Sequence, residues 1–245
     1  NNLTILTTNA TNGQIIETYP NEYNNNNYTI TIKSATTGLY ESAQWNGTLI
    51  NERDSIKVSA KNIYANANST ITIKATIYKK NNPTTDRIPV AIKINNLTIA
   101  TMNVTNSQIE YQYKLPDNLS QKEYNLTIVT ADTQNVIQST TDFKLFVTRN
   151  YQQINVQNIT AHRNGTVKIK ANITDKNGNI IRSNQLVNIK IAGITIANIN
   201  ATDGIIEYDY TLPNLKCGSY EVILKTGQTN CYMHATSQSV LKIVD

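Results

Sequence analysis

The segment Ile-Glu-Tyr-Asp-Tyr-Thr-Leu-Pro at residues 206–213 decides the interpretation of this 245-residue chain, because it occurs more than once. An earlier copy at residues 109–116 reads Ile-Glu-Tyr-Gln-Tyr-Lys-Leu-Pro and begins 97 residues upstream. A looser copy, Ile-Ile-Glu-Thr-Tyr-Pro, occupies residues 15–20, about one period earlier. A spacing of this length holds one compact β domain. The chain is therefore expected to be a tandem array of similar domains.

The composition favours an all-β protein. Asn (36 residues) and Thr (33) are the commonest residue types, whereas charged residues make up only 16% of the chain. With 9 Gly, the sequence resembles neither a flexible linker nor a charged disordered tail. The apolar residues are mostly Ile and Val in short alternating runs, and long amphipathic helical blocks are absent, as expected of strands.

Tyrosines mark the period of the array. Tyr28, Tyr124 and Tyr220 each begin an alternating run and lie 96 residues apart. They divide the chain into residues 1–52, 53–149 and 150–245. The second and third parts each hold seven alternating segments, the number typical of an immunoglobulin-like β-sandwich. The expected strands are 55–60, 70–78, 88–94, 97–101, 108–115, 123–130 and 141–147 in the second part, and 154–158, 166–174, 186–191, 194–198, 205–211, 220–226 and 239–244 in the third.

The first part, residues 1–52, matches only the second half of the repeat. The predicted fold class is therefore all-β, with tandem immunoglobulin-like β-sandwiches and an incomplete first unit. Half a sandwich exposes sheet edges and apolar faces to water. Two explanations stay open: the segment is cut from a longer array, or another chain supplies the missing strands by strand exchange. The short links between units predict an elongated, semi-rigid rod.

Cys217 and Cys231 are the only cysteines. A disulfide between them would close a loop within the third unit and stabilise it by about 3 kcal/mol through loop-closure entropy. Two free thiols are one alternative. A metal site of Cys217, Cys231 and His234, with His162 as a weak fourth ligand, is the other. We favour the disulfide, which would place the protein outside a reducing cytosol, and assign no metal.

No residue pattern indicates an enzyme. Neither histidine accompanies a Ser or Cys in a recognisable nucleophile setting, and Glu110 and Glu207 are equivalent strand residues of the repeat. Residues 175–179, Asp-Lys-Asn-Gly-Asn, lack the Glu of an EF-hand calcium loop and predict a tight turn with positive φ at Asn177-Gly178. The repeated tyrosines predict tyrosine corners, in which the hydroxyl bonds to nearby backbone. We therefore expect no catalytic residue and no cofactor.

The acceptor motif for N-glycosylation, Asn-X-Ser/Thr, is unusually frequent. It occurs thirteen times, whereas composition alone predicts roughly 6 to 7 occurrences. Two interpretations remain open: a surface protein coated with glycans, or Asn and Thr alternation in strands that creates the motif incidentally. The candidate acceptors are Asn2, Asn9, Asn27, Asn46, Asn68, Asn96, Asn103, Asn118, Asn125, Asn158, Asn164, Asn172 and Asn200.

The charge pattern argues against a nucleic-acid partner. The net charge is +5, from 22 basic and 17 acidic residues, and the Lys residues are scattered singly through the expected strands. Phosphate affinity needs several cations on one face, so no binding to nucleic acid is expected. No apolar run of about 18 residues occurs, so the chain is not expected to span a membrane itself.

Several motifs of the third unit together resemble a known repeat. They are Asp-Lys-Asn-Gly-Asn-Ile at 175–180, Val-Asn-Ile-Lys-Ile-Ala-Gly at 187–193, Asp-Gly at 203–204, Cys-Gly-Ser-Tyr at 217–220 and Asn-Cys-Tyr at 230–232. The pattern resembles the bacterial-type immunoglobulin-like repeat found in tandem in adhesin-like surface proteins of methanogenic archaea. The second unit departs from it, with Gln-Lys-Glu-Tyr at 121–124 and Asn-Val at 135–136. The resemblance implies an extracellular, cell-anchored stalk or adhesin, and it carries over no binding residues.

The sequence thus predicts a non-enzymatic, extracellular adhesin-like segment at the cell surface, with stalk or contact modules for attachment to a cell or matrix. Its expected partners are other surface proteins or glycans. The alternative function is a structural subunit of an extracellular filament or surface layer, assembled by strand exchange with neighbouring chains. A carbohydrate-binding module of a surface enzyme is a third hypothesis.

Overall fold

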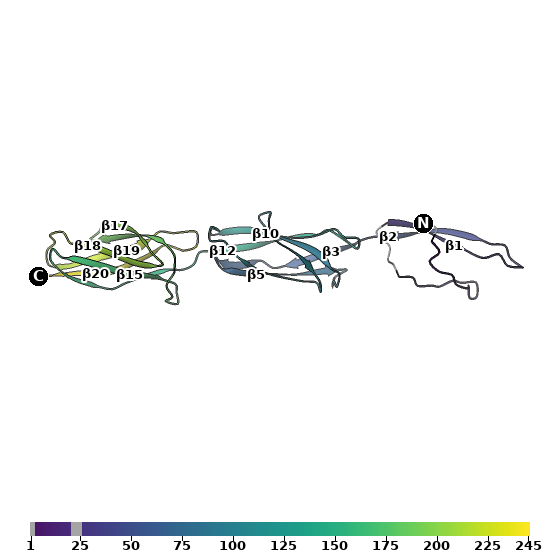
Figure 1. Ribbon diagram of the computed structural model, residues 1–245, viewed down its shortest axis with the longest axis horizontal. Helices are drawn as coiled ribbons and strands as arrows, with labels where there is room; N and C mark the ends of the chain where they lie inside the picture. The colour runs from purple at the N-terminus through teal and green to yellow at the C-terminus, as the bar shows by residue number, and fades with distance from the viewer. Residues whose placement is uncertain (1–2, 21–25) are drawn as a thin grey trace.

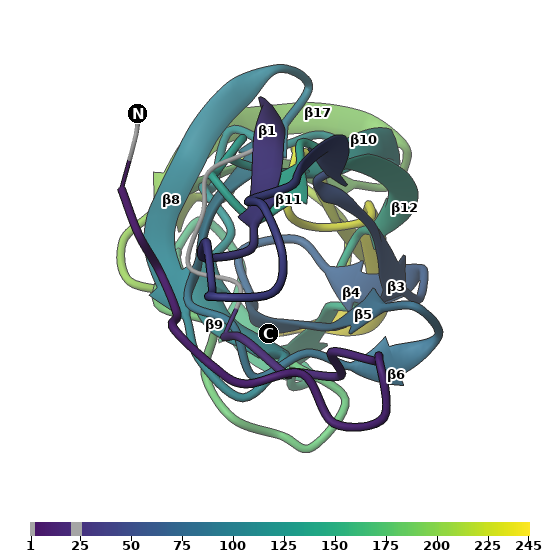
Figure 2. The same ribbon diagram turned by 90° about the vertical axis from the view of Figure 1, so that its right-hand side faces the viewer.

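The computed structural model describes residues 3–20 and 26–245, which form strands and connecting loops. These residues include no helix that is long and apolar enough to cross a membrane. Figure 1 shows three units in a row, and Figure 2, viewed along the row, shows the units stacked behind one another. The chain therefore forms an elongated rod, as the short links between its units predict.

The middle unit contains all seven strands expected in its part of the sequence and three short ones besides. Its strands are β3 (Asp54–Ala60), β4 (Ile63–Asn66), β5 (Thr70–Lys79), β6 (Asn82–Pro83), β7 (Ile88–Ile94), β8 (Leu97–Val104), β9 (Gln108–Lys114), β10 (Lys122–Thr130), β11 (Val136–Ile137) and β12 (Thr140–Thr148). One sheet has the order β4-β12-β10-β7-β8. The other has the order β11-β3-β5-β6, with β9 paired to β5. The strands missed by the sequence, β4, β6 and β11, have two to four residues, too few for alternation to be recognised.

The third unit repeats this plan. Its strands are β13 (Gln153–Val156), β14 (Ile159–His162), β15 (Thr166–Thr174), β16 (Gln185–Ile191), β17 (Ile194–Ala201), β18 (Ile205–Thr211), β19 (Gly218–Thr226) and β20 (Ala235–Val244). They form a sheet of order β14-β20-β19-β16-β17 and a sheet of order β13-β15-β18. In both complete units the first two strands lie in different sheets. β3 and β13 belong to one sheet, whereas β4 and β14 pair in parallel with the last long strand of the other, β12 and β20.

The first unit has a single pair of strands among its described residues. β1 (Asn26–Lys33) and β2 (Gln44–Asn51) form an antiparallel pair, with Tyr28 opposite Leu49 and Ile32 opposite Trp45. Residues 3–20 run without a strand, apart from an isolated bridge between Thr11 and Gln14. The expected half-unit is thus present as the counterpart of β10 and β12, without a second sheet over it.

Alternation of apolar and polar residues creates the core of each complete unit. In β5 the side chains of Ile71, Ile73 and Ile77 are buried, while Lys74 between them is exposed. Successive side chains of a strand point to opposite faces, so the apolar residues of the alternation line the core and the polar residues face the solvent. Each fully buried Ile contributes roughly 1.5–3 kcal/mol by leaving water.

Asn residues fill many of the tight turns. Asn95 (φ 44°) and Asn96 (φ 69°) join β7 to β8, and Asn106 (φ 63°) with Ser107 (φ 61°) joins β8 to β9. Two-residue hairpin loops of this kind require positive φ, which Asn adopts more readily than most residues. Part of the high Asn content is thus explained by backbone geometry.

The turn predicted at residues 175–179 is confirmed in position, with Gly178 (φ 85°) as its one residue of positive φ. The Asp175 carboxylate accepts hydrogen bonds from the backbone N–H of Asn177 (2.8 Å) and Asn179 (3.0 Å), and from the Asn179 side-chain amide (3.0 Å). The Asn179 side chain, followed by the backbone donors, lowers the pKa of Asp175. The carboxylate therefore holds the turn closed through these hydrogen bonds.

The repeat provides a matched test of core burial. Leu126→Ala removes a fully buried side chain and should destabilise the middle unit by about 2–5 kcal/mol. The equivalent change in the first unit, Ile30→Ala, should cost less than about 1 kcal/mol because Ile30 is already 37% exposed. Native-state hydrogen exchange on peptides from each unit measures both effects. Equal losses at the two positions would contradict the assignment of an uncovered face to the first unit.

Candidate functional site

An apolar sheet face of the first unit is open to solvent. Opposite residues in β1 and β2 share a face, which carries Ile30, Ile32 and Trp45. Ile30 and Ile32 are 37% and 45% exposed, whereas their equivalents in the middle unit, Leu126 and Ile128, are fully buried. We call this surface, formed by Tyr28, Ile30, Ile32, Trp45 and Leu49, the open face.

The open face has the geometry of half a core. In the middle unit, β10 pairs with β7 through Leu126 opposite Ile94 and Ile128 opposite Ile92. β1, the counterpart of β10, pairs with β2 alone among the described strands. Trp45 lies over Gly47, so its ring covers a position that could not carry a side chain without moving the ring. Among the described residues, the face therefore lacks the covering that buries its counterpart in the middle unit.

The middle and third units meet in a packed joint. We define the joint as residues 116–121 of the middle unit, residues 227–234 of the third unit and the linking residues 149–152. Cys231 is buried among core residues of the middle unit, and Tyr232 packs against both cores. Burial raises the pKa of the Tyr232 hydroxyl. A shared apolar contact of this kind restricts the angle between the two units.

Polar contacts secure the joint on both sides. The Asn150 side-chain amide donates to the carbonyl oxygens of Ala67 (2.9 Å), in the middle unit, and Cys231 (3.1 Å), in the third. The Arg149 guanidinium donates to the Thr229 carbonyl (2.6 Å) and to the Gln121 side-chain oxygen (2.8 Å). The side chains of Arg149 and Asn150 therefore each contact both units.

Sequence reasoning missed the role of Arg149 and Asn150. The repeat contained a signal for it, because Arg53 and Asp54 stand 96 residues earlier at the start of the middle unit. Asp54 donates its backbone N–H to the Asn135 carbonyl (2.9 Å), as Asn150 does to that of Cys231 (2.7 Å). Asp54 also bonds Lys79 and Lys80, chiefly the latter, and this lowers its pKa. The same position thus begins each complete unit.

The structure corrects the predicted disulfide. Cys217 and Cys231 are both free thiols, and they lie at opposite ends of the nine-residue strand β19. Such a strand spans roughly 27–30 Å, whereas a disulfide needs Cα atoms within about 7 Å. Cys217 donates to the Asp245 carboxylate (3.0 Å) at the far end of the third unit, and Cys231 donates to the Asp117 carbonyl (3.1 Å) in the joint. The disulfide no longer supports an extracellular location.

The alternative metal ligands are equally separated. His162 lies beside Asp245 at the far end of the third unit (Nδ1 to carbonyl oxygen, 2.7 Å), whereas His234 follows Cys231 in the joint. Within residues 3–20 and 26–245, no three His, Cys, Asp or Glu residues are grouped so that they could hold a metal ion. Glu110 and Glu207 form exposed cross-strand ion pairs with Lys74 (3.1 Å) and Lys170 (3.4 Å). The repeated glutamates therefore have a structural explanation.

The tyrosine corners are confirmed in both complete units. The Tyr124 hydroxyl donates to the Ser120 carbonyl (2.9 Å), and the Tyr220 hydroxyl donates to the Lys216 carbonyl (2.8 Å). Each bond ties the start of a strand to the loop four residues earlier. These tyrosines hold the fold and leave no hydroxyl directed at a ligand.

The candidate glycosylation sites lie mostly on the surface. Asn2 is outside the described residues, and of the other twelve acceptors only Asn172 is half-buried. Its side-chain oxygen is buried without a hydrogen-bond partner in the described part of the chain. The remaining eleven, which are Asn9, Asn27, Asn46, Asn68, Asn96, Asn103, Asn118, Asn125, Asn158, Asn164 and Asn200, are exposed.

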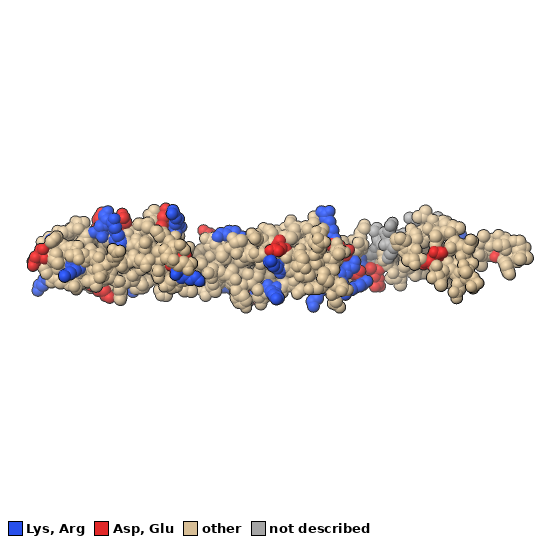
Figure 3. All heavy atoms as spheres, turned by 90° about the horizontal axis from the view of Figure 1, so that it is seen from below, with Lys and Arg blue, Asp and Glu red and all other residues tan. Residues whose placement is uncertain are grey.

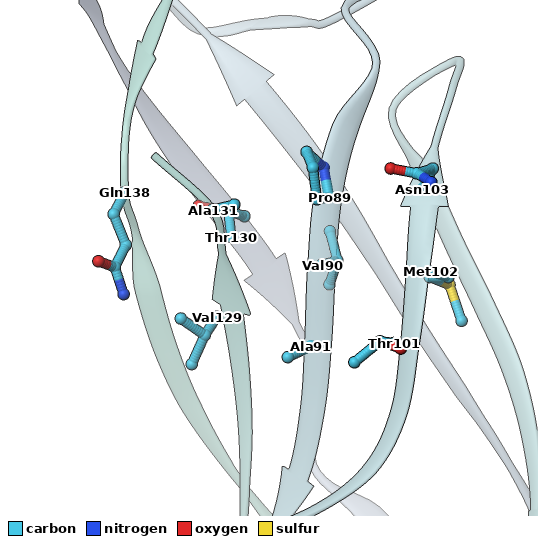
Figure 4. A pocket seen from close by; sticks show the side chains of 10 residues that line it. All are labelled: Pro89, Val90, Ala91, Thr101, Met102, Asn103, Val129, Thr130, Ala131 and Gln138. Carbon is cyan, nitrogen blue, oxygen red and sulfur yellow. The ribbon is translucent and has the colours of Figure 1, made fainter. Parts of the chain in front are cut away.

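A shallow groove crosses the outer face of the sheet in the middle unit. Figure 4 shows it between β7, β8 and β10, with Pro89 and Asn103 side by side near one end. Its other lining residues are Val90, Ala91, Thr101, Met102, Val129, Thr130, Ala131 and Gln138. Besides apolar side chains, the lining holds the hydroxyls of Thr101 and Thr130 and the amides of Asn103 and Gln138, and it includes no Asp, Glu, His, Lys or Cys.

Charges are sparse on the surface. On the face seen in Figure 3, Lys and Arg lie singly or beside Asp and Glu, and wide stretches carry neither. The three features that distinguish this molecule are therefore surfaces: the open face, the joint and the exposed Asn-X-Ser/Thr motifs.

Comparison with known proteins found likenesses among solved structures alone. No family model and no curated protein matches the chain. Among solved structures, it is similar to fibronectin(III)-like modules of CbhA from Clostridium thermocellum (15% identity, TM-score 0.30, covering 76% of this chain and 94% of that chain). It is also similar to the titin domains z1z2 in complex with telethonin (14% identity, TM-score 0.44, 79% and 98%). The sheet topology of the two complete units is that of a tandem of immunoglobulin-like β-sandwiches. Likenesses at these identities and TM-scores assign no function.

The joint makes a prediction about the Asn150 side chain. Asn150→Ala removes two hydrogen bonds between the units and should weaken the joint by about 1–2 kcal/mol. The angle between the units should then vary more widely, which small-angle X-ray scattering detects as a broader distribution of molecular dimensions. Asn188→Ala, in an exposed cross-strand pair within the third unit, is the control. An unchanged distribution in Asn150→Ala would show that the joint does not depend on this side chain.

The free thiols make a second prediction. Cys217 should react with iodoacetamide in the native protein, whereas buried Cys231 should react only after denaturation. The hydrogen bond to the Asp245 carboxylate raises the pKa of Cys217, so its reaction should accelerate as the pH rises above the ordinary thiol range. Mass spectrometry of alkylated peptides measures both rates. A native protein in which neither thiol reacts until a reductant is added would reinstate the disulfide.

Proposed function

We propose that this chain is a segment of a non-enzymatic, extracellular adhesin-like protein. Its immunoglobulin-like units form a stalk or contact surface that carries attachment to another cell or to a matrix. The observation that carries this proposal is the packed joint, because side chains from both units fix neighbouring modules end to end. A stiff row of modules keeps its two ends at a more constant distance than a flexible chain does, and it transmits force along its length.

The surface chemistry agrees with this role. The outer strands are rich in Asn and Thr and poor in charge. The resemblance of residues 175–232 to repeats of archaeal adhesin-like surface proteins supports the same conclusion. The proposed partners are other cell-surface proteins or glycans, and the proposed location is the cell surface.

Digestion of intact cells with a protease tests this proposal. Peptides of the chain should be released from intact cells before any cytosolic marker protein appears. A loop such as residues 176–179 is exposed and suits cleavage. Peptides that appear only after lysis would contradict a surface location.

The open face favours a second candidate function, a subunit of an extracellular filament or surface layer assembled by strand exchange. A neighbouring chain would supply strands beside β1 and a second sheet over Ile30 and Ile32. In this arrangement the apolar face that water now meets becomes a core like that of the middle unit.

Sedimentation velocity separates the two candidates. If strand exchange occurs, the chain should form oligomers whose proportion rises with concentration. The paired change Ile30→Asp and Ile32→Asp should abolish them, while Thr29→Asp and Thr31→Asp, on alternate positions of β1, should not. A monomer at all concentrations would leave the stalk as the supported function.

A further inference from the structure

In the two complete units, two long edge strands lack the usual protection against pairing with other chains. β8 and β17 each end a five-stranded sheet and have a neighbour on one side only. Each has eight residues, Leu-Thr-Ile-Ala-Thr-Met-Asn-Val and Ile-Thr-Ile-Ala-Asn-Ile-Asn-Ala, with no charged residue and no proline. Edge strands of this kind are templates for aggregation unless something covers them.

The other long edge strands differ. β9 pairs only with β5, and it carries Glu110 and Lys114. β18 pairs only with β15, and it carries Glu207 and Asp209. Charges on an edge oppose its pairing with another strand. Among the long edge strands of the two complete units, the missing protection is therefore specific to β8 and β17.

A bulge disturbs only one half of each unprotected strand. The register shifts between Ile92 and Lys93 in the β7–β8 pair, and between Ile189 and Lys190 in the β16–β17 pair. Both shifts lie near the hairpin turn. The half of each strand farther from that turn pairs regularly and contains Asn103 in β8 and Asn200 in β17.

Asn103 and Asn200 begin equivalent glycosylation motifs. Asn103-Val-Thr105 and Asn200-Ala-Thr202 lie 97 residues apart, the spacing of the repeated segment that follows them. The first unit has the related motif Asn9-Ala-Thr11 before its own tight turn at Asn12-Gly13. The motif thus recurs at one place in all three units.

Most other acceptor asparagines have a structural reason to be Asn. Asn68, Asn96 and Asn164 occupy positions of positive φ. Others accept hydrogen bonds through their side-chain oxygens: Asn46 from Thr31 and Gln44, Asn125 from Lys144, and Asn158 from the backbone of Val240. Asn118 lies in the joint, where its carbonyl accepts from Asn230, and Asn172 is half-buried.

No such reason applies to Asn103 and Asn200. Both are exposed on extended strands, and within the described part of the chain neither side chain has a hydrogen-bond partner. Each faces an exposed apolar residue on the neighbouring strand, with Asn103 opposite Pro89 (Figure 4) and Asn200 opposite Leu186, which is 59% exposed. The C–H face of a sugar attached to either Asn would cover that residue.

We propose that Asn103 and Asn200 carry N-linked glycans that shield the edge strands β8 and β17. The donor is a polyprenyl-phosphate-linked oligosaccharide. The side-chain nitrogen Nδ2 of Asn bonds to C1 of the first sugar and gives up one proton, while the C1–O bond breaks and the lipid phosphate leaves with the bonding electrons. The inference rests on the proposed extracellular function, since the modification needs access to that donor outside the cytosol.

Glycopeptide mass spectrometry of the protein isolated from its own cells tests this assignment. Both Asn103 and Asn200 peptides should carry sugar. Glycans on other acceptors, with Asn103 and Asn200 bare, would overturn the inference while leaving the proposed function intact. A protein that is released from intact cells by protease yet carries no sugar would overturn the inference alone. A protein that is released only by lysis and carries no sugar would overturn both.

Variants test the shielding role. Thr105→Ala with Thr202→Ala removes both motifs and keeps both asparagines, so the mass should fall by one glycan at each site and the oligomeric fraction in sedimentation velocity should rise several-fold. Thr105→Ser with Thr202→Ser keeps the motifs and should behave as the natural protein. Thr98→Ala with Thr166→Ala removes the turn motifs at Asn96 and Asn164 as a matched control. A glycan-free Thr105→Ala, Thr202→Ala variant that stays monomeric would overturn the shielding role.

Discussion

The need to cover a sheet face rich in Ile and Val governs this structure. Strands such as β5 and β10 place an aliphatic residue at every second position, and this makes one face of each sheet insoluble by itself. In the two complete units a second sheet covers that face, and residues such as Ile73 and Leu126 lose all contact with water. In the described part of the first unit the same alternation meets no second sheet, and the open face follows from it.

The same constraint explains the joint. Each sandwich is open at its ends, where loops leave the core partly accessible. The third unit inserts Cys231 into the end of the middle core and shares Tyr232 between the two cores. The Asn150 side chain then donates hydrogen bonds to the carbonyl groups of Ala67 and Cys231, which belong to the two units and are buried by this contact. Neighbouring units thus complete each other at their ends, and a rod results.

Much of this arrangement follows from the sequence, because the long strands alternate strictly and the repeat shows where each unit begins again. The tyrosine corners were also predictable, because Tyr124 and Tyr220 recur at the same place in the repeat, and the turn at Gly178 was predictable from the residues Asn177-Gly178 between two strands. Short strands such as β4 were not, since four residues hold too little alternation to recognise. The disulfide prediction failed because two cysteines close in sequence were treated as close in space. The intervening strand β19 was visible in the alternation of residues 220–226, and its length was sufficient to separate Cys217 from Cys231.

The proposed stalk depends on the ends of the units, because it requires that the middle and third units keep a fixed relative orientation. The most direct measurement is the alignment of the middle and third units by residual dipolar couplings of the intact chain. The packed joint predicts that amides of both units fit one common alignment tensor. Two tensors of different magnitude or orientation would show that the units move independently, and the stiff stalk would have to be abandoned.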